Sequence, residues 1–313
     1  MKKVSFVIPC YRSANTIGVV VDEIRDTMPT LPEYDYEIIL VNDCSPDNTF
    51  DVISALARSD GRITAVDLAK NFGQHAALMS GISHSTGDFV VCLDDDGQTP
   101  ANEVGKLLAR LEQDDCDVAM ASYEHKQHSA FRNFGTKLNN RMTEIMLGKP
   151  RDLSMTSYFA IKRFVVDEML KYKNCFPYLD GLILRCTRRI RTVPVQHRAR
   201  MEGSSGYTLG KLFALWMDGF TAFSVKPLRL ASIFGALTAF AGFIYTIVII
   251  IKHFIYSDIP TGWSSTMALQ LILGGVILLV LGLVGEYIGR IYMCINAAPQ
   301  YVERSVIRRG DGE

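Results

Sequence analysis

The sequence has no excess of charge of either sign. It contains 33 Lys and Arg residues and 33 Asp and Glu residues in 313 positions, so its formal net charge at pH 7 is zero. Because nucleic-acid-binding proteins normally carry a basic surplus or a basic stripe, this balance argues against a nucleic-acid partner. The 7 cysteines are scattered, without a CxxC pair or metal-finger spacing. That pattern is typical of reduced thiols in a cytosolic compartment.

Several common signatures are also missing. There is no GxGxxG or GxxxxGK[ST] loop, which argues against the Rossmann dinucleotide and P-loop classes. There is no HExxH zincin motif and no GxSxG nucleophile elbow. Lys2 and Lys3 are followed by an apolar run of only strand length, so we expect no signal peptide at the N-terminus.

The first part of the chain alternates between short apolar runs and helical patterns. The runs predict strands at 4–8, 37–41, 64–67 and 89–93, and the periodicity predicts helices at 14–27, 49–59, 74–84 and 103–113. Strands that alternate with helices imply a mainly parallel sheet, and ligands of such sheets bind at the carboxyl ends of the strands. We therefore predict an α/β domain over residues 1–208, with its site at that edge.

An acidic cluster follows the predicted strand at 89–93. Asp94, Asp95 and Asp96 stand in a row there, and carboxylates at a strand end can hold a divalent ion that neutralises a diphosphate. The alternative is that one aspartate caps a helix beginning near Pro100. Three adjacent acids repel one another, so a cap alone explains them poorly, and we favour a metal site.

Two further segments end predicted strands at the same edge. Asp43 follows the strand at 37–41, where it can accept hydrogen bonds from a base or a ribose. Asp47 or Asn48 is better explained as the cap of the next helix. Tyr11 follows the first strand and either packs on a nucleobase or belongs to the core.

The last third of the chain is apolar. Residues 230–251 and 267–285 contain no charged side chain, and about 20 apolar residues suffice to cross a bilayer as a helix. We predict a two-helix transmembrane hairpin over 229–290, the alternative being a buried helix pair in a soluble core. The segment 209–228 is either an interfacial helix on the membrane or an ordinary packing helix.

Lys and Arg residues predict the orientation of the hairpin. The connection 252–266 holds a single basic residue, whereas both flanks of the hairpin are basic; the flanking residues are Lys211, Lys226, Arg229, Arg290, Arg304, Arg308 and Arg309. The positive-inside rule then places the large domain and the C-terminal tail (291–313) in the cytosol.

Seven ordered motifs resemble a known family. They are PCY (9–11), VNDCSPDNT (41–49), NFGQHAAL (71–78), DDDGQTP (94–100), RxxGxSxY (200–207), PLR (227–229) and GEYIGRIY (285–292). The order is similar to that of the polyprenyl-phosphate glycosyltransferases of the inverting, GT-A-fold family 2. This group contains dolichyl-phosphate mannose synthases, bactoprenol glucosyltransferases and undecaprenyl-phosphate formamidoarabinose transferases. The resemblance covers nearly the whole chain and does not identify the sugar.

The resemblance implies roles for individual residues. Asp96 and Gln98 are expected near a Mg²⁺ or Mn²⁺ ion. The donor, a UDP-sugar, is expected to contact the residues that line the nucleotide site, which are Pro9, Tyr11, Asn42, Asp43, Asn71, Asp94 and Asp95. The sequence departs from the family pattern twice. Asn42 replaces the first acid of the usual DDGS, and the segment around Ser157 lacks the aspartate that many members carry as a proposed base.

The missing base is compatible with catalysis, because a lipid phosphate is already largely anionic at neutral pH. Such a nucleophile needs positioning more than deprotonation. The residues expected to position it are Arg132, Lys137, Arg200, Ser205 and Tyr207. For Arg132 and Lys137 the alternative is solvated surface charge.

Together with the predicted hairpin and its orientation, the resemblance implies an enzyme of a bacterial inner membrane. It is expected to transfer one sugar from a UDP-sugar to a polyprenyl phosphate with inversion, and to form a homo-oligomer, for which the resemblance implies a tetramer. One alternative is a processive polysaccharide synthase, which usually carries a QxxRW motif and more spans than this chain has. Another is a membrane-anchored nucleotide-sugar-binding subunit without catalysis, supported only by the missing acid at Ser157.

Overall fold

The computed structural model describes residues 1–123, 155–196, 226–255 and 262–309, with the single positions 144, 150 and 153. The chain divides into two compact units. One comprises Met1–Thr208 together with Ala297–Glu313, and the other comprises Leu209–Asn296. The chain therefore returns to its first unit after the hairpin.

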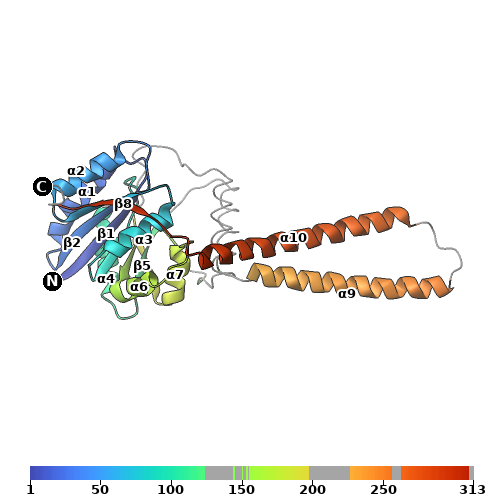
Figure 1. The fold of residues 1–313 in the computed structure, drawn as a ribbon. Coiled ribbons are helices and arrows are strands. Elements are labelled where there is room, and N and C mark those ends of the chain that lie inside the picture. The colour runs from blue at the N-terminus through green and yellow to red at the C-terminus, as the bar shows by residue number, and fades with distance from the viewer. Residues whose placement is uncertain are drawn as a thin grey trace. The chain divides into compact units, whose positions relative to one another are not determined.

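The first unit is built on an eight-stranded sheet with the order β7-β5-β6-β4-β1-β2-β3-β8 (Figure 1). The strands are β1 (Lys2–Cys10), β2 (Tyr34–Asn42), β3 (Ile63–Leu68), β4 (Phe89–Cys92), β5 (Val118–Tyr123), β6 (Phe159–Lys162), β7 (Ile190–Val195) and β8 (Glu303–Ile307). The four strands β3, β2, β1 and β4 are mutually parallel. The four predicted strands and the mainly parallel sheet are confirmed.

Helices cover both faces of this sheet (Figure 1). They are α1 (Ile17–Thr27), α2 (Thr49–Ser59), α3 (Gln74–His84), α4 (Val104–Leu111), α6 (Arg163–Leu170) and α7 (Leu179–Cys186), with short 3₁₀ turns at Met28–Thr30 and Ala101–Glu103. Alternate side chains of a strand point to opposite faces. Phe6 and Ile8 accordingly pack in the cluster that holds α1 and α4. Val7 faces Gly81 of α3 on the other side.

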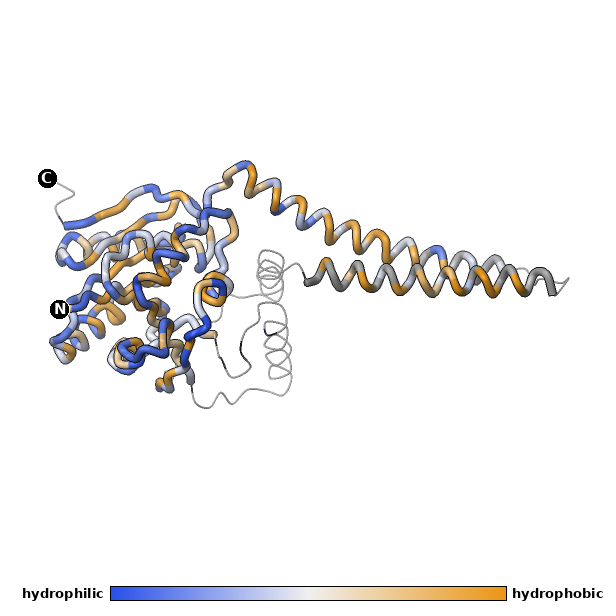
Figure 2. Tube along the Cα trace, turned by 90° about the horizontal axis from the view of Figure 1, so that it is seen from below, coloured by the Kyte–Doolittle hydropathy of each residue, from blue (hydrophilic) through white to orange (hydrophobic). Residues whose placement is uncertain are grey.

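The second unit contains two long helices, α9 (Lys226–Ile255) and α10 (Trp263–Ile295). Figure 2 shows apolar residues along both of them. Among the described residues, one stretch is long and apolar enough to cross a membrane, Leu273–Ile295, and none of it is buried within the chain. The second span, expected at 230–251, stays a prediction. The segment 209–228, predicted as an interfacial or packing helix, lies outside the described residues except for its last three positions, which belong to α9.

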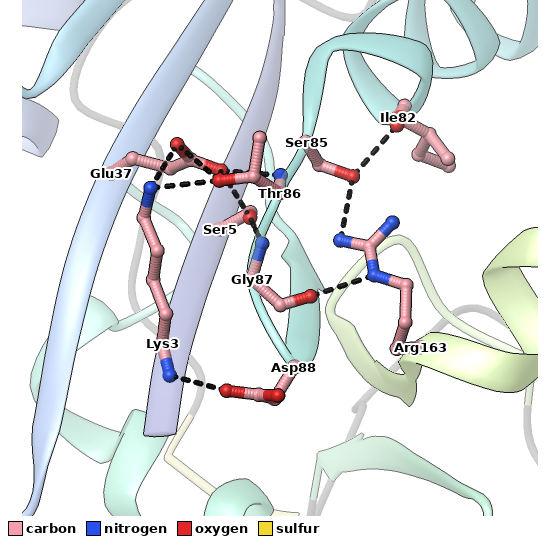
Figure 3. Close-up of polar contacts among 9 residues, drawn as sticks. All are labelled: Lys3, Ser5, Glu37, Ile82, Ser85, Thr86, Gly87, Asp88 and Arg163. Carbon is pink, nitrogen blue, oxygen red and sulfur yellow. Dashed lines mark hydrogen bonds and ion pairs between the residues drawn. The ribbon is translucent and has the colours of Figure 1, made fainter. Parts of the chain in front are cut away.

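A polar cluster joins β1, β2 and the turn before β4 (Figure 3). The Lys3 ammonium lies 2.6 Å from the Glu37 carboxylate. The Ser5 hydroxyl and the Thr86 amide each donate to the same carboxylate at 2.6 Å. Ser5 in turn accepts the amide of Gly87 at 2.8 Å. The cluster ties the start of the central parallel strands together through one carboxylate.

Gly87 approaches β1 too closely for a side chain. A Cβ built there meets the Lys3 carbonyl oxygen at 2.6 Å and the Ser5 amide nitrogen at 2.9 Å, and both are backbone atoms. We expect Gly87→Ala to destabilise the protein by about 1–3 kcal/mol, as overpacking does elsewhere. The apparent melting temperature of the purified protein in detergent measures this. The matched control is Gly18→Ala in α1, where an added Cβ meets nothing within 4 Å; equal melting temperatures for the two variants would refute the prediction.

The same cluster predicts an acid-dependent loss of stability. Burial raises the pKa of Glu37, but the charge and hydrogen bonds of Lys3, Ser5 and the Thr86 amide outweigh it and hold the pKa below its ordinary value. A depressed folded-state pKa means that the stabilisation is present above the unfolded value of about 4.3 and is lost as the pH falls through the folded pKa. Glu37→Gln should therefore flatten the acid limb of a stability profile. An acid limb identical to that of the unsubstituted protein would contradict this.

Candidate active site

The parallel strands bring the three predicted segments to one edge of the sheet. In the register, Cys10 of β1 lies opposite Asn42 of β2, and Asn42 lies opposite Asp67 of β3. The Tyr11 amide then donates to Asp95 at 3.0 Å, which joins the loop after β1 to the loop after β4. The motifs that end β1, β2 and β4 therefore share one surface, as the alternation of strands and helices predicts.

Asp95 is fixed by the loop that follows β1. Besides the Tyr11 amide, its carboxylate accepts a hydrogen bond from the Ser13 hydroxyl. Burial raises the pKa of Asp95 and the negative charge of Asp96 adds to the rise, while the two donors oppose it. The donors thus favour an ionised carboxylate in a position that burial disfavours.

Asp94 is held from two other directions. The Gln74 side-chain amide, from the first residue of α3, donates to one oxygen at 3.1 Å, and the Ser157 hydroxyl donates to the other. Burial raises the pKa of Asp94 to about 6; the Ser157 and Gln74 hydrogen bonds oppose the rise, and the charges of Asp96 and Asp95 add to it. The charges of Asp95 and Asp96 therefore add to the cost of ionising Asp94, which a nearby cation would relieve.

Asp96 lies in the turn that follows. Its carboxylate accepts the Gln98 amide at 3.0 Å, and Gly97 between them has φ 72°, a left-handed conformation that favours glycine. The helical turn after it begins at Ala101, its N-cap residue is Pro100 and no side chain caps it, so the capping alternative for the acidic cluster is wrong.

The acidic cluster fits a divalent cation that takes only one or two ligands from the protein. Within the described ranges, no group of three or more His, Cys, Asp or Glu side chains is placed to hold a metal ion. Mg²⁺ in enzymes is often held by one or two carboxylates and completed by substrate phosphates and water. Asp96 suits that arrangement as a single carboxylate in the turn after β4, beside Asp94 and Asp95. The assignment of metal to Asp96 and Gln98 stays a prediction.

Asp43 organises the loop that leads into α3. Its two carboxylate oxygens accept the amides of Phe72 and Gly73 at 2.7 and 2.9 Å, and the Asn71 side chain donates to its carbonyl oxygen at 3.2 Å. Burial raises the pKa of Asp43, and the two amides oppose the rise. Two predicted nucleotide residues, Asp43 and Asn71, are thus in direct contact.

Asn42 has a supporting role that the sequence did not suggest. It is 3% exposed, its amide nitrogen donates to Asp67 at 2.7 Å and its oxygen accepts the Ser45 amide at 3.1 Å. An acid at this position would place two carboxylates in contact. The amide is therefore the side chain that fits beside Asp67, which accounts for the first departure from the family pattern.

Pro9 and Tyr11 end β1 at the same edge. Pro9 is half-buried in the strand, and Tyr11 is 46% exposed. An exposed aromatic ring beside a half-buried carboxylate, that of Asp95, offers a stacking face for a planar base. The prediction that Tyr11 contacts a nucleobase is compatible with this exposure and stays a prediction.

The sequence analysis did not identify three side chains that donate to the acidic cluster. They are Ser13, Gln74 and Ser157. Gln74 stands inside the NFGQHAAL motif, which was a usable signal. The five residues predicted to position the acceptor phosphate lie outside the described residues; they are Arg132, Lys137, Arg200, Ser205 and Tyr207.

Comparison with protein families decides the classification. Residues 5–170 match the model described as glycosyl transferase family 2, and residues 226–291 match the GtrB C-terminal hairpin. This chain belongs to glycosyl transferase family 2. The predicted family is confirmed, and the match to the hairpin model covers α9 and most of α10.

Curated relatives match this glycosyltransferase over nearly its whole length. The undecaprenyl-phosphate 4-deoxy-4-formamido-L-arabinose transferase of Klebsiella pneumoniae is 32% identical over 312 residues, covering 99% of this chain and 95% of the relative. The enzyme of the same name from Enterobacter is also 32% identical, over 98% of this chain and 94% of its own.

Solved structures confirm the GT-A-like fold of the glycosyltransferase. Glucosyl-3-phosphoglycerate synthase of Mycobacterium tuberculosis has a TM-score of 0.51 and 19% identity, over 69% of this chain and 77% of that one. Its complex with Mn²⁺, uridine diphosphate and phosphoglyceric acid has a TM-score of 0.52, with 75% of that chain covered. At this identity the likeness concerns the fold alone.

The contact between Ser157 and Asp94 predicts which substitution the site tolerates. Ser157→Asp would place a second carboxylate against Asp94, and we expect the initial rate of glycosyl transfer to fall by at least about tenfold, since like charges in contact cost more than one pKa unit. Ser157→Thr keeps the hydroxyl donor and serves as the matched control. A rate that rises with Ser157→Asp would show that a missing base limits the enzyme.

Proposed function

We propose that this glycosyltransferase transfers one sugar from a UDP-sugar to a polyprenyl phosphate, with inversion, at the cytosolic face of a bacterial inner membrane. The proposal rests on the combination of an acidic site and an apolar hairpin in one chain. Three carboxylates meet at the ligand-binding edge of a family 2 domain, and the same chain continues into an apolar hairpin. Similarity along 99% of the chain to undecaprenyl-phosphate transferases supports the acceptor class.

The donor is assigned to the edge formed by the loops after β1, β2 and β4. Tyr11 supplies the exposed ring for the uracil, and the segment from Asp43 to Asn71 borders the ribose. Asp94 and Asp95, held by their protein donors, fix the loop that presents Asp96. A divalent cation bound at Asp96 and Gln98 would neutralise the diphosphate as the glycosidic bond breaks.

The chemical step exchanges one bond at the anomeric carbon. A phosphate oxygen of the lipid forms a bond to this carbon from one face while the bond to the diphosphate breaks on the other, and UDP leaves. Because the second pKa of a phosphate monoester is about 6, the nucleophile needs no general base at pH 7. We assign its orientation to Arg200, with Arg132, Lys137, Ser205 and Tyr207 as further donors.

The hairpin is proposed to hold the active site at the depth of the lipid headgroups. α9 and α10 would both span the bilayer, with the N-terminal unit and the C-terminal tail in the cytosol. Anchoring raises the effective concentration of a lipid acceptor.

We further propose a homo-oligomer, with a tetramer as the working assumption. At four glycines of α10 an added Cβ meets no atom within 4 Å, so this chain leaves room there for close helix contact; they are Gly274, Gly275, Gly282 and Gly285. A monodisperse monomer in mild detergent would contradict the oligomer.

A donor panel tests the proposal. Purified protein in detergent receives undecaprenyl phosphate, Mn²⁺ and one radiolabelled UDP-sugar at a time, including the 4-deoxy-4-formamido-L-arabinose donor suggested by the relatives. We expect label from one donor to enter the organic phase and EDTA to abolish the transfer. Absence of transfer from every donor, by folded protein that binds nucleotide, would favour a non-catalytic binding subunit.

Asp96→Ala separates an enzyme from a scaffold. Loss of the proposed metal ligand should reduce the initial rate by roughly 100-fold or more, comparable to removing a key electrostatic group from other active sites. Asp51→Asn, an exposed acid in the first turn of α2, is the matched control and should leave the rate unchanged. Full activity of Asp96→Ala would remove the acidic cluster from the mechanism.

A further inference from the structure

We propose that Arg304, in the strand that follows the hairpin, is a positioning residue for the donor site. It acts through Asp67 and Asn42 on the loop after β2. The inference rests on the proposed function in one respect, namely that this loop borders the nucleotide. It assigns to the C-terminal tail a role that the sequence analysis did not give it, since residues 291–313 were expected only to be cytosolic.

The tail is part of the sheet rather than an appendage to it. β8 pairs antiparallel with β3, with Val66 opposite Val306 and Leu68 opposite Glu303. The Ala69 amide extends the pairing by donating to the Val302 carbonyl at 2.8 Å. Residues 296–302 alone connect this strand to the end of α10. The hairpin is therefore followed directly by an edge strand of the domain that carries the acidic cluster.

The Glu303 side chain anchors β8 to the helix that borders the site. Its carboxylate accepts the Ser80 hydroxyl at 2.7 Å and lies 3.0 Å from the His84 ring nitrogen, both in α3. This contact fixes the strand against a helix whose first residue, Gln74, holds Asp94. The neighbouring residue, Arg304, is then placed beside the carboxyl end of β3.

Arg304 binds the end of β3 at two points. One guanidinium nitrogen lies 3.2 Å from the Asp67 carboxylate, and the other donates to the Ala69 carbonyl at 3.0 Å. Asp67 connects Arg304 to β2, because its second carboxylate oxygen accepts a hydrogen bond from the Asn42 side-chain amide at 2.7 Å. Asn42 in turn accepts the Ser45 amide at 3.1 Å. Four residues thus connect β8 to the turn next to Asp43.

The burial of the two partners explains why loss of this contact should affect the loop after β2 more than the stability of the whole domain. The Asp67 side chain is 4% exposed, so its charge requires donors, whereas the Arg304 side chain is 60% exposed. A half-exposed ion pair contributes little to overall stability. Its removal leaves Asp67 with the Asn42 amide as the only remaining donor among the contacts described above. The expected consequence is a looser loop after β2 and not an unfolded domain.

The test measures donor affinity in full-length protein. Arg304→Met should raise the KM for the UDP-sugar, and the Kd for UDP by calorimetry, by roughly fivefold, because an exposed ion pair rarely contributes a full factor of ten. The kcat and the KM for the lipid should stay within about twofold. Arg304→Lys keeps the charge but cannot bridge both acceptors, so it should recover part of the affinity. Arg309→Met is the matched control, since Arg309 lies against Gly61 before the start of β3.

A double substitution tests the route through Asp67. Asp67→Asn removes the buried charge that needs Arg304, so adding Arg304→Met to Asp67→Asn should change the donor KM much less than Arg304→Met does alone. Fully additive effects would overturn the route. A donor KM unchanged in Arg304→Met, or changed equally in Arg309→Met, would overturn the inference itself.

Hydrogen exchange separates this inference from the proposed function. Arg304→Met should speed exchange in the peptides that cover 42–45 and 67–73, while the peptides of α1 and α4 stay protected. This readout needs no substrate. Faster exchange there, combined with no transfer by the unsubstituted protein from any donor, would contradict the proposed function and leave the coupling intact. Unchanged exchange at 42–45 would overturn the coupling whatever the activity.

Discussion

Asp94 loses solvation when the sheet forms, and so do Asp95, Asp43 and Asp67 at the same edge. Each of these carboxylates needs donors, and the donors come from segments that lie far apart in the sequence from the acid that they contact. Ser157 and Gln74 donate to Asp94, the loop after β1 donates to Asp95, and the loop that leads into α3 donates to Asp43. The need to satisfy buried negative charge therefore fixes the loops around the site.

The two departures from the usual family pattern share this physical cause. At Asn42 and at Ser157 the sequence has a hydrogen-bond donor where the family pattern described in the sequence analysis leads one to expect an acid. Each donor meets a carboxylate, Asn42 at Asp67 and Ser157 at Asp94. The missing acid at Ser157 therefore needs no explanation by loss of function, since the serine has a defined partner in the acidic cluster.

The strands that the sequence predicted are those marked by a pattern within a few neighbouring residues. Residues 37–41 and 89–93 are short apolar runs before polar turns, and both form strands of the parallel sheet. β8 was not predicted, because its sequence ERSVI carries little apolar signal and its partner β3 lies more than 200 positions earlier. The strand forms because the edge of β3 offers unpaired backbone groups. Contacts such as that of Arg304 with Asp67 depend on this pairing and have no local signature.

The most direct test of the central claim is the mass of the lipid product. The organic phase of a reaction with the preferred UDP-sugar can be compared by mass spectrometry with the starting polyprenyl phosphate. The account predicts a single added sugar per phosphate, with one UDP released for each lipid converted. Release of UDP without any change in the mass of the lipid, or a ladder of several added sugars, would contradict it.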